Sequence, residues 1–124
     1  MSNLARFKYL NIEPNNEELQ DCVIRAISLA TAIPYDSIVE MLAQNGDNNS
    51  CDCINVCCYT KLIEDLGYYT HDVKDLSVEA IADKYPNDVV LIRIKGHLTC
   101  AIDGCIYDLW DCRDKIATRY WIII

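Results

Sequence analysis

The sequence places one cysteine where thiol chemistry is favoured. Cys22 lies in the stretch ELQDCVIRAIS, where the spacing of apolar residues predicts that an amphipathic helix begins. The positive end of a helix dipole favours a thiolate, and the backbone N–H groups there can stabilise a developing oxyanion. Cys22 is therefore a candidate nucleophile. The alternative is that it packs as a small apolar residue in the core.

A thiol nucleophile also needs a base, and the chain has two histidines. His97 follows Gly96 at the start of a predicted strand, where a side chain is held rigidly. His71 lies in YYTHDVKD, which we expect to be a connecting segment without such support. His97 is therefore the expected partner of Cys22.

The imidazole should be oriented by an acid or amide on a neighbouring strand. Asp103-Gly104 is a dipeptide typical of tight hairpin turns, and it separates HLTCAI from CIYDLWD. A hairpin with this turn places Asp108 diagonal to His97 and on the same face. Asp108 is the expected orienting acid, and Asp111 is within reach as an alternative.

These residues resemble a known family. DCVIRAI on a first helix, KGHLTCAIDGCIYDLWD on a hairpin and the closing RYWIII look like the small papain-like cysteine peptidase domains of bacterial and phage-type proteins. The resemblance covers roughly residues 20–29 and 89–124, and the middle of the chain only in helical character. It implies that Cys22 is the nucleophile, His97 the general base and acid, and Asp108 the orienting acid.

The chain also departs from the larger members of that family. Only 75 positions separate Cys22 from His97, fewer than the spacing of about 130 to 150 in papain and the cathepsins, and their local signature around the cysteine is missing. Larger members place a glutamine several residues upstream of the nucleophile. Gln20 matches this oxyanion-side amide loosely, so Asn15, Asn16 or Gln20 would have to serve.

The resemblance implies a thiol hydrolase that cleaves an amide, peptide or isopeptide bond in a protein or peptide substrate, without a cofactor. Transfer of the acyl group to an amine would use the same residues. One alternative is a catalytically inactive papain-like protein that acts as a phage or bacterial protein-binding module, an inhibitor or effector whose acidic surface suits a basic target.

A second alternative is a metal-binding protein built on the segment CDCINVCC. Thiolates are preferred ligands of zinc and of iron–sulfur clusters. The spacing argues against a metal, because all four ligands would come from one short segment and two are neighbours on a helix that point different ways. We expect no metal there. The four cysteines of this cluster are Cys51, Cys53, Cys57 and Cys58.

The periodicity predicts helices first and strands afterwards. The first helix begins near residue 18 or 21. On it we expect Arg25 to be structural, either pairing with an acid such as Asp21 or capping a loop. Asn45-Gly46 is expected to stop the second helix, and Ser77 to cap the fourth. We therefore predict a single α+β domain over residues 1–124, a minimal papain-like fold with N-terminal helices at about 18–85 packed on one face of a small C-terminal antiparallel sheet at about 88–124. The predicted helices span about residues 18 or 21 to 31, 35–44, 56–66 and 78–85.

The composition excludes several classes of protein. Eleven basic and nineteen acidic residues give a net charge of −8, which would repel a nucleic-acid backbone. The longest apolar runs are too short to span a membrane, and no signal peptide is recognisable. We therefore expect a cytoplasmic protein, in the host cytoplasm if phage-encoded, that binds neither nucleic acid nor membrane. Its eight cysteines are then expected to be thiols, ligands or catalytic groups instead of disulfides.

Overall fold

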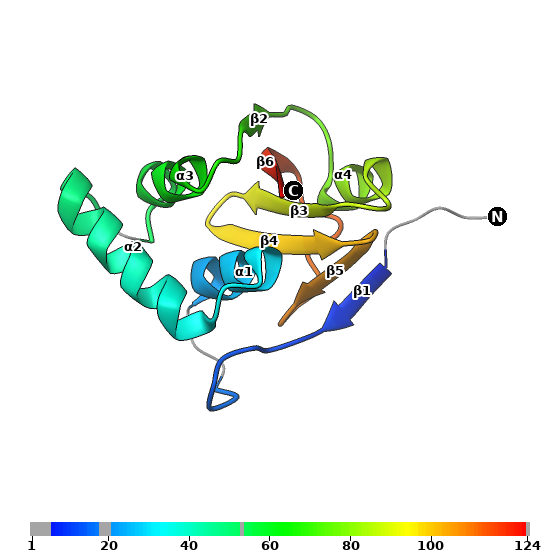
Figure 1. Ribbon diagram of the computed structural model, residues 1–124. Helices are drawn as coiled ribbons and strands as arrows, with labels where there is room; N and C mark the ends of the chain where they lie inside the picture. Colours follow the sequence, from blue (N-terminus) through cyan, green and yellow to red (C-terminus); the bar gives the residue numbers. More distant parts are fainter. Residues whose placement is uncertain (1–5, 18–20, 53, 124) are drawn as a thin grey trace.

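The computed structural model describes residues 6–17, 21–52 and 54–123, which form an α+β fold (Figure 1). Its helices are α1 (Cys22–Thr31), α2 (Tyr35–Asn49), α3 (Val56–Asp65) and α4 (Val78–Lys84). Its strands are β1 (Arg6–Tyr9), β2 (Thr70–Asp72), β3 (Val89–Ile94), β4 (His97–Ile102), β5 (Cys105–Asp108) and β6 (Ala117–Ile123).

The strands form one sheet in the order β1-β5-β4-β3-β6-β2. The C-terminal strands are antiparallel, as predicted, but β1 pairs in parallel with β5 at one edge, and the two strands lie side by side in Figure 1 although they are far apart in the sequence. The prediction of a purely C-terminal antiparallel sheet is therefore wrong at both edges. β1 and β2 have four and three residues, too few to show a clear alternation.

The central strands are joined by tight turns. Asp103 and Gly104 both have positive φ, 50° and 75°, as a two-residue hairpin turn requires. Ile102 pairs with Cys105, so the predicted register is confirmed.

The sheet is covered on both faces. Side chains of β3 alternate, so that Leu91 packs with α1, α2 and α3 while Val90 and Ile92 pack with α4. The prediction that all helices lie on one face is therefore wrong for α4. The continuous apolar run of β3 is the reason, because a strand buried on both faces needs a layer on each side.

α2 is longer than predicted. It continues through Asn45 and Gly46 to Asn49 and ends at Ser50, which has a φ of 53°. The Asn45 side chain is buried and donates a hydrogen bond of 2.7 Å to the backbone oxygen of Cys58 on α3. The Asn-Gly pair therefore serves the contact between the two helices and does not stop α2.

The expectation that the cysteines are not bridged is wrong for one pair. Cys51 and Cys58 form a disulfide that links the end of α2 to α3. Two of the four proposed metal ligands are thereby consumed, Cys57 is a free exposed thiol, and Cys53 lies outside the described residues. The metal-binding alternative loses its ligand set.

Within the described ranges, no single helix is long and apolar enough to cross a membrane. α1 and α2 reach that length and composition only as a pair, and the pair is bent by 116° at the break between them.

Candidate active site

Cys22 is the first residue of α1 and is half-buried at the mouth of a cleft. Its thiol interacts with the side chain of His97 and with the backbone of Leu98, and both interactions lower the pKa of the thiol. α1 packs against β4, and this contact brings the start of the helix to the start of the strand. The first turn of α1 therefore faces the imidazole with its dipole and its unpaired N–H groups.

His97 is the first residue of β4 and follows a tight turn. Ile94 pairs with His97 across this turn, and Gly96 has a φ of 75°, which a residue with a side chain rarely adopts. Gly96 and His97 were predicted to begin a strand, and the hairpin explains why the imidazole is held in a fixed position. His71, the other histidine, lies in β2 and stacks on Tyr120 at 4.9 Å, so the expectation of a connecting segment there is wrong.

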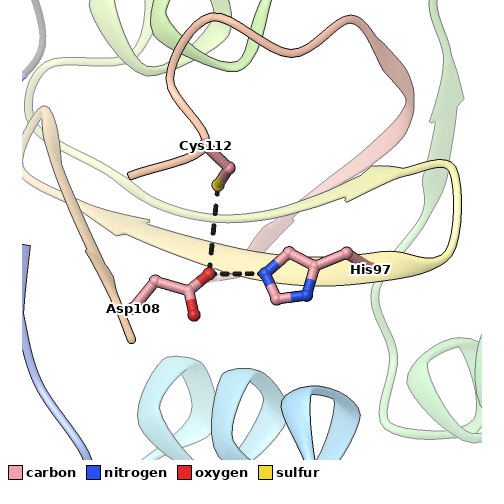
Figure 2. Close-up of side chains that lie close together, drawn as sticks. All are labelled: His97, Asp108 and Cys112. Atoms are coloured by element: carbon pink, nitrogen blue, oxygen red, sulfur yellow. Dashed lines mark hydrogen bonds and ion pairs between the residues drawn. The ribbon is translucent and has the colours of Figure 1, made fainter. Parts of the chain in front are cut away.

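The structure joins His97 to Asp108. Nε2 of the imidazole is 2.6 Å from Oδ2 of the carboxylate, and Figure 2 shows the second ring nitrogen directed toward the side on which α1 lies. Because Nε2 is occupied by Asp108, Nδ1 is the nitrogen available to Cys22. The ring is thus held between the carboxylate and the thiol.

Asp108 is buried, with 2% of its surface exposed. Its Oδ1 accepts hydrogen bonds from the backbone N–H of Leu109 at 2.7 Å and from Arg25 at 3.2 Å. Asp111, the alternative acid, instead pairs with Arg113 at the surface. The acid that contacts the imidazole is therefore Asp108.

Arg25 belongs to a buried charge network. Its Nε donates to Asp21 at 2.6 Å, as the sequence analysis expected, and its NH1 reaches Asp108. Tyr35 on α2 donates a hydrogen bond to the other oxygen of Asp21 at 2.7 Å. Burial and this bond raise the pKa of the Tyr35 hydroxyl far above its usual value, so it remains a donor.

The contacts shift the pKa values toward an ion pair. Burial raises the pKa of the Cys22 thiol, but the hydrogen bond with His97 and the charges of His97 and Arg25 outweigh it and leave this pKa below its usual value. Burial lowers the pKa of His97, but hydrogen bonds, led by that with Asp108, raise it to about 11. The pKa of Asp108 is lowered, because its bond to the imidazole outweighs its own burial.

A cleft of about 610 Å³ opens beside the thiol. Trp110 forms one side, with its ring centroid 4.9 Å from that of His97 and an angle of 45° between the planes. The segment between α2 and α3 forms another wall. Continuing the register of β4 and β5 places Trp110 opposite His97, which is the signal in the sequence for its position beside the imidazole. The remaining lining residues include Ile54, Asn55, Val56, Tyr59 and Arg93.

A third side chain, Cys112, joins His97 and Asp108 (Figure 2). One potential ligand atom from each residue lies within 4.8 Å of the others, and nitrogen, oxygen and sulfur are all zinc ligands. The surroundings fit a cation poorly. The Asp108 carboxylate already neutralises the guanidinium of Arg25 and binds the imidazole, so a metal would have to displace both and lie beside a positive charge.

The oxyanion-side amides are placed only in part. Gln20 lies outside the described residues. Asn15 and Asn16 are exposed and do not line the cleft beside Cys22. The backbone N–H of Cys22 at the helix start remains a donor that the described residues supply.

No family model, curated protein or solved structure in the comparisons matches this chain. The papain-like resemblance therefore depends on the sequence motifs alone, and the geometry of Cys22, His97 and Asp108 is the structural observation that bears on function.

Proposed function

We propose that this protein is a papain-like thiol hydrolase that cleaves an amide, peptide or isopeptide bond in a protein or peptide substrate. One observation carries the proposal. The thiol at the first residue of α1 interacts with an imidazole, which lowers the pKa of the thiol, and Nε2 of that imidazole is 2.6 Å from a buried carboxylate. A half-buried cysteine serving only as packing has no need of this chain of contacts, nor of a cleft beside it.

The arrangement supports a two-step reaction. The Cys22 thiolate attacks the carbonyl carbon, and the oxyanion that forms is stabilised by the N–H groups at the start of α1. Nδ1 of His97 gives its proton to the leaving amine as the C–N bond breaks, which leaves a thioester. His97 then removes a proton from water, the hydroxide attacks the thioester, and the carboxylic acid and thiolate are released. Asp108 keeps the ring oriented throughout and stabilises its charged form before the first proton transfer and after the second.

The proposal is tested by alkylation of Cys22 with iodoacetamide, followed by peptide mapping with mass spectrometry. We expect Cys22 to react faster than the exposed thiol Cys57 at pH 6.5. We also expect His97→Ala to slow the reaction of Cys22 by about tenfold or more, because the thiolate loses its counter-charge. Cys57 is the control within each sample, since it should react equally in both proteins.

Labelling of Cys22 that is undiminished in His97→Ala would show that the two residues do not work as a pair. A second result would contradict catalysis separately. If Cys22→Ser preserves every effect of the protein on its target while charge reversal of surface acids abolishes that effect, the protein is a binding module.

A further inference from the structure

The cleft has a charge opposite to that of the whole molecule. The protein carries a net charge of −8, yet no described residue lining the cleft is Asp or Glu, and two are arginines, Arg25 and Arg93. The charge of Arg25 is balanced by Asp21 and Asp108, which are buried beside it. Arg93 is therefore the cleft arginine whose charge remains to be explained.

Arg93 is held in place by neutral groups. Its NH1 donates a hydrogen bond of 2.8 Å to the hydroxyl of Thr118 on β6. Tyr59, which also lines the cleft, interacts with the same guanidinium, and this interaction acts to lower the pKa of its hydroxyl. Among the residues that the structure describes, no carboxylate lies within ion-pair distance of Arg93. Its position is fixed, and its charge is uncompensated.

The position of Arg93 in the sheet is unfavourable for stability. It lies directly opposite Arg119 in the pairing of β3 with β6, and like charges directly opposite one another are destabilising. Arg119 is partly compensated by Asp72 at 3.4 Å. Arg93 has no such carboxylate among the described residues and lines the cleft. An anion from outside the protein would give it an ion-pair partner there.

Arg93 is also close to the nucleophile. Tyr59 interacts electrostatically with both Cys22 and Arg93, and all three residues line the same cleft. A substrate whose carbonyl carbon is at Cys22 can therefore reach Arg93 within this cleft. The guanidinium fork matches a carboxylate in geometry as well as in charge.

We infer that Arg93 anchors a carboxylate-binding subsite, and that the substrates are peptides with a carboxylate close to the bond that is cleaved. This inference rests on the proposed thiol hydrolase function and names its substrate class. The carboxylate comes either from an Asp or Glu side chain or from a free chain end, and both would make the same charge-assisted bonds with Arg93.

The test compares thiol-reactive peptides that differ in one charge. In the first series, each peptide ends in a vinyl sulfone, and Glu is compared with Gln at each of the three residues before it. In the second series, an epoxysuccinyl peptide with a free carboxylate is compared with the same peptide in its amide form. Alkylation rates at Cys22 are measured by mass spectrometry. In one of the two series, we expect the acid form to alkylate wild-type Cys22 about tenfold faster than the amide form, equivalent to roughly 1.4 kcal/mol. A preference in the vinyl sulfone series would identify an Asp or Glu side chain as the source of the carboxylate, and a preference in the epoxysuccinyl series would identify a free chain end.

Arg93→Gln should abolish this preference, and Arg119→Gln is the matched control. Arg119 lies on the neighbouring strand and does not line the cleft, so its loss should leave the preference largely intact. Neutral iodoacetamide should label Cys22 at the wild-type rate in Arg119→Gln, because the pair with His97 is untouched.

The two proposals fail in different ways. Equal rates for acid and amide forms in both series, with iodoacetamide labelling still dependent on His97, would overturn the role of Arg93 alone. A preference that survives Arg93→Gln would do the same. Labelling of Cys22 that does not depend on His97 would overturn the thiol hydrolase and the substrate class with it.

Discussion

Burial works against the charges of Cys22 and His97, so their state depends on specific contacts. Taken alone, burial raises the pKa of the thiol and lowers that of the imidazole, which favours the neutral pair. The bond from His97 to Asp108 reverses this for the imidazole, and the charged imidazole then lowers the pKa of the thiol. Asp108 therefore controls the reactivity of Cys22 without contacting it.

This dependence predicts how the pH profile of Cys22 responds to two matched variants. In the wild type, alkylation should reach half its maximal rate at a pH below the usual thiol pKa of about 8.5. Asp108→Asn should shift this midpoint upward, since the pKa of His97 falls and the thiolate loses its cation at neutral pH. Asp111→Asn should leave the midpoint unchanged, because Asp111 pairs with Arg113 at the surface.

The profile is obtained from iodoacetamide rates between pH 5 and pH 10, with circular dichroism to verify that each variant is folded. An equal midpoint in the wild type and in folded Asp108→Asn would show that the carboxylate does not set the charge of His97.

At the scale of elements, the three candidate residues come from two rigid units. The antiparallel unit β3-β4-β5 carries His97 just after one tight turn, and Asp108 at the end of β5 after another. α1 lies across β4 and supplies Cys22. The wall of the cleft at Ile54 and Asn55 is different, because these two residues belong to the connection between α2 and α3.

The disulfide holds this connection. Cys51 and Cys58 flank the wall residues, and closing so short a loop stabilises a fold by roughly 2 to 3 kcal/mol in the chain-entropy treatment. The double variant Cys51→Ala with Cys58→Ala should lose about 2 kcal/mol of unfolding free energy in urea. It should also bind or cleave peptides less well, while iodoacetamide still labels Cys22.

Cys57→Ala is the control for that variant, because Cys57 is an exposed free thiol next to the bridge. It should change neither stability nor peptide reactivity. If the double variant matches Cys57→Ala in both measurements, the bridge does not support the cleft wall.

At the scale of the whole molecule, local signals in the sequence were enough to predict the central hairpin and most of the helix starts. The Asp-Gly turn fixed the register of β4 and β5, and Ser77 caps α4 by accepting a hydrogen bond from Ala80, as expected. These features depend on a few neighbouring residues. The contact of His97 with Asp108 followed from the register.

What could not be predicted depends on distant partners. β1 is a strand only because β5 offers it an edge, and Asn45 continues α2 only because the Cys58 carbonyl accepts its amide. The role of Arg93 in the cleft needs α3 and β6 to be in place. A free Cys57 beside a bridged Cys58 likewise requires the packing of α2 on α3, since spacing cannot choose among the cysteines.

The charge network around Arg25 joins the helical layer to the sheet and should be costly to break. Arg25 on α1 contacts Asp21 before that helix and Asp108 on β5, and all three residues are buried. Removing one member of a buried ion pair leaves an uncompensated charge and costs about 3 to 5 kcal/mol. Arg25→Met should therefore lower the free energy of unfolding in urea by that amount.

Two further variants show whether the loss of stability in Arg25→Met comes from a buried carboxylate that is left without a cation. Lys61→Met removes the cation of an exposed pair with Asp65 on α3 and should change stability by less than about 1 kcal/mol. Adding Asp21→Asn to Arg25→Met should recover part of the loss, because Asp108 keeps His97 as a partner while Asp21 would keep only the Tyr35 hydroxyl. A cost for Arg25→Met no greater than that for Lys61→Met would mean that packing, and not charge, holds α1 on the sheet and so places Cys22 beside His97.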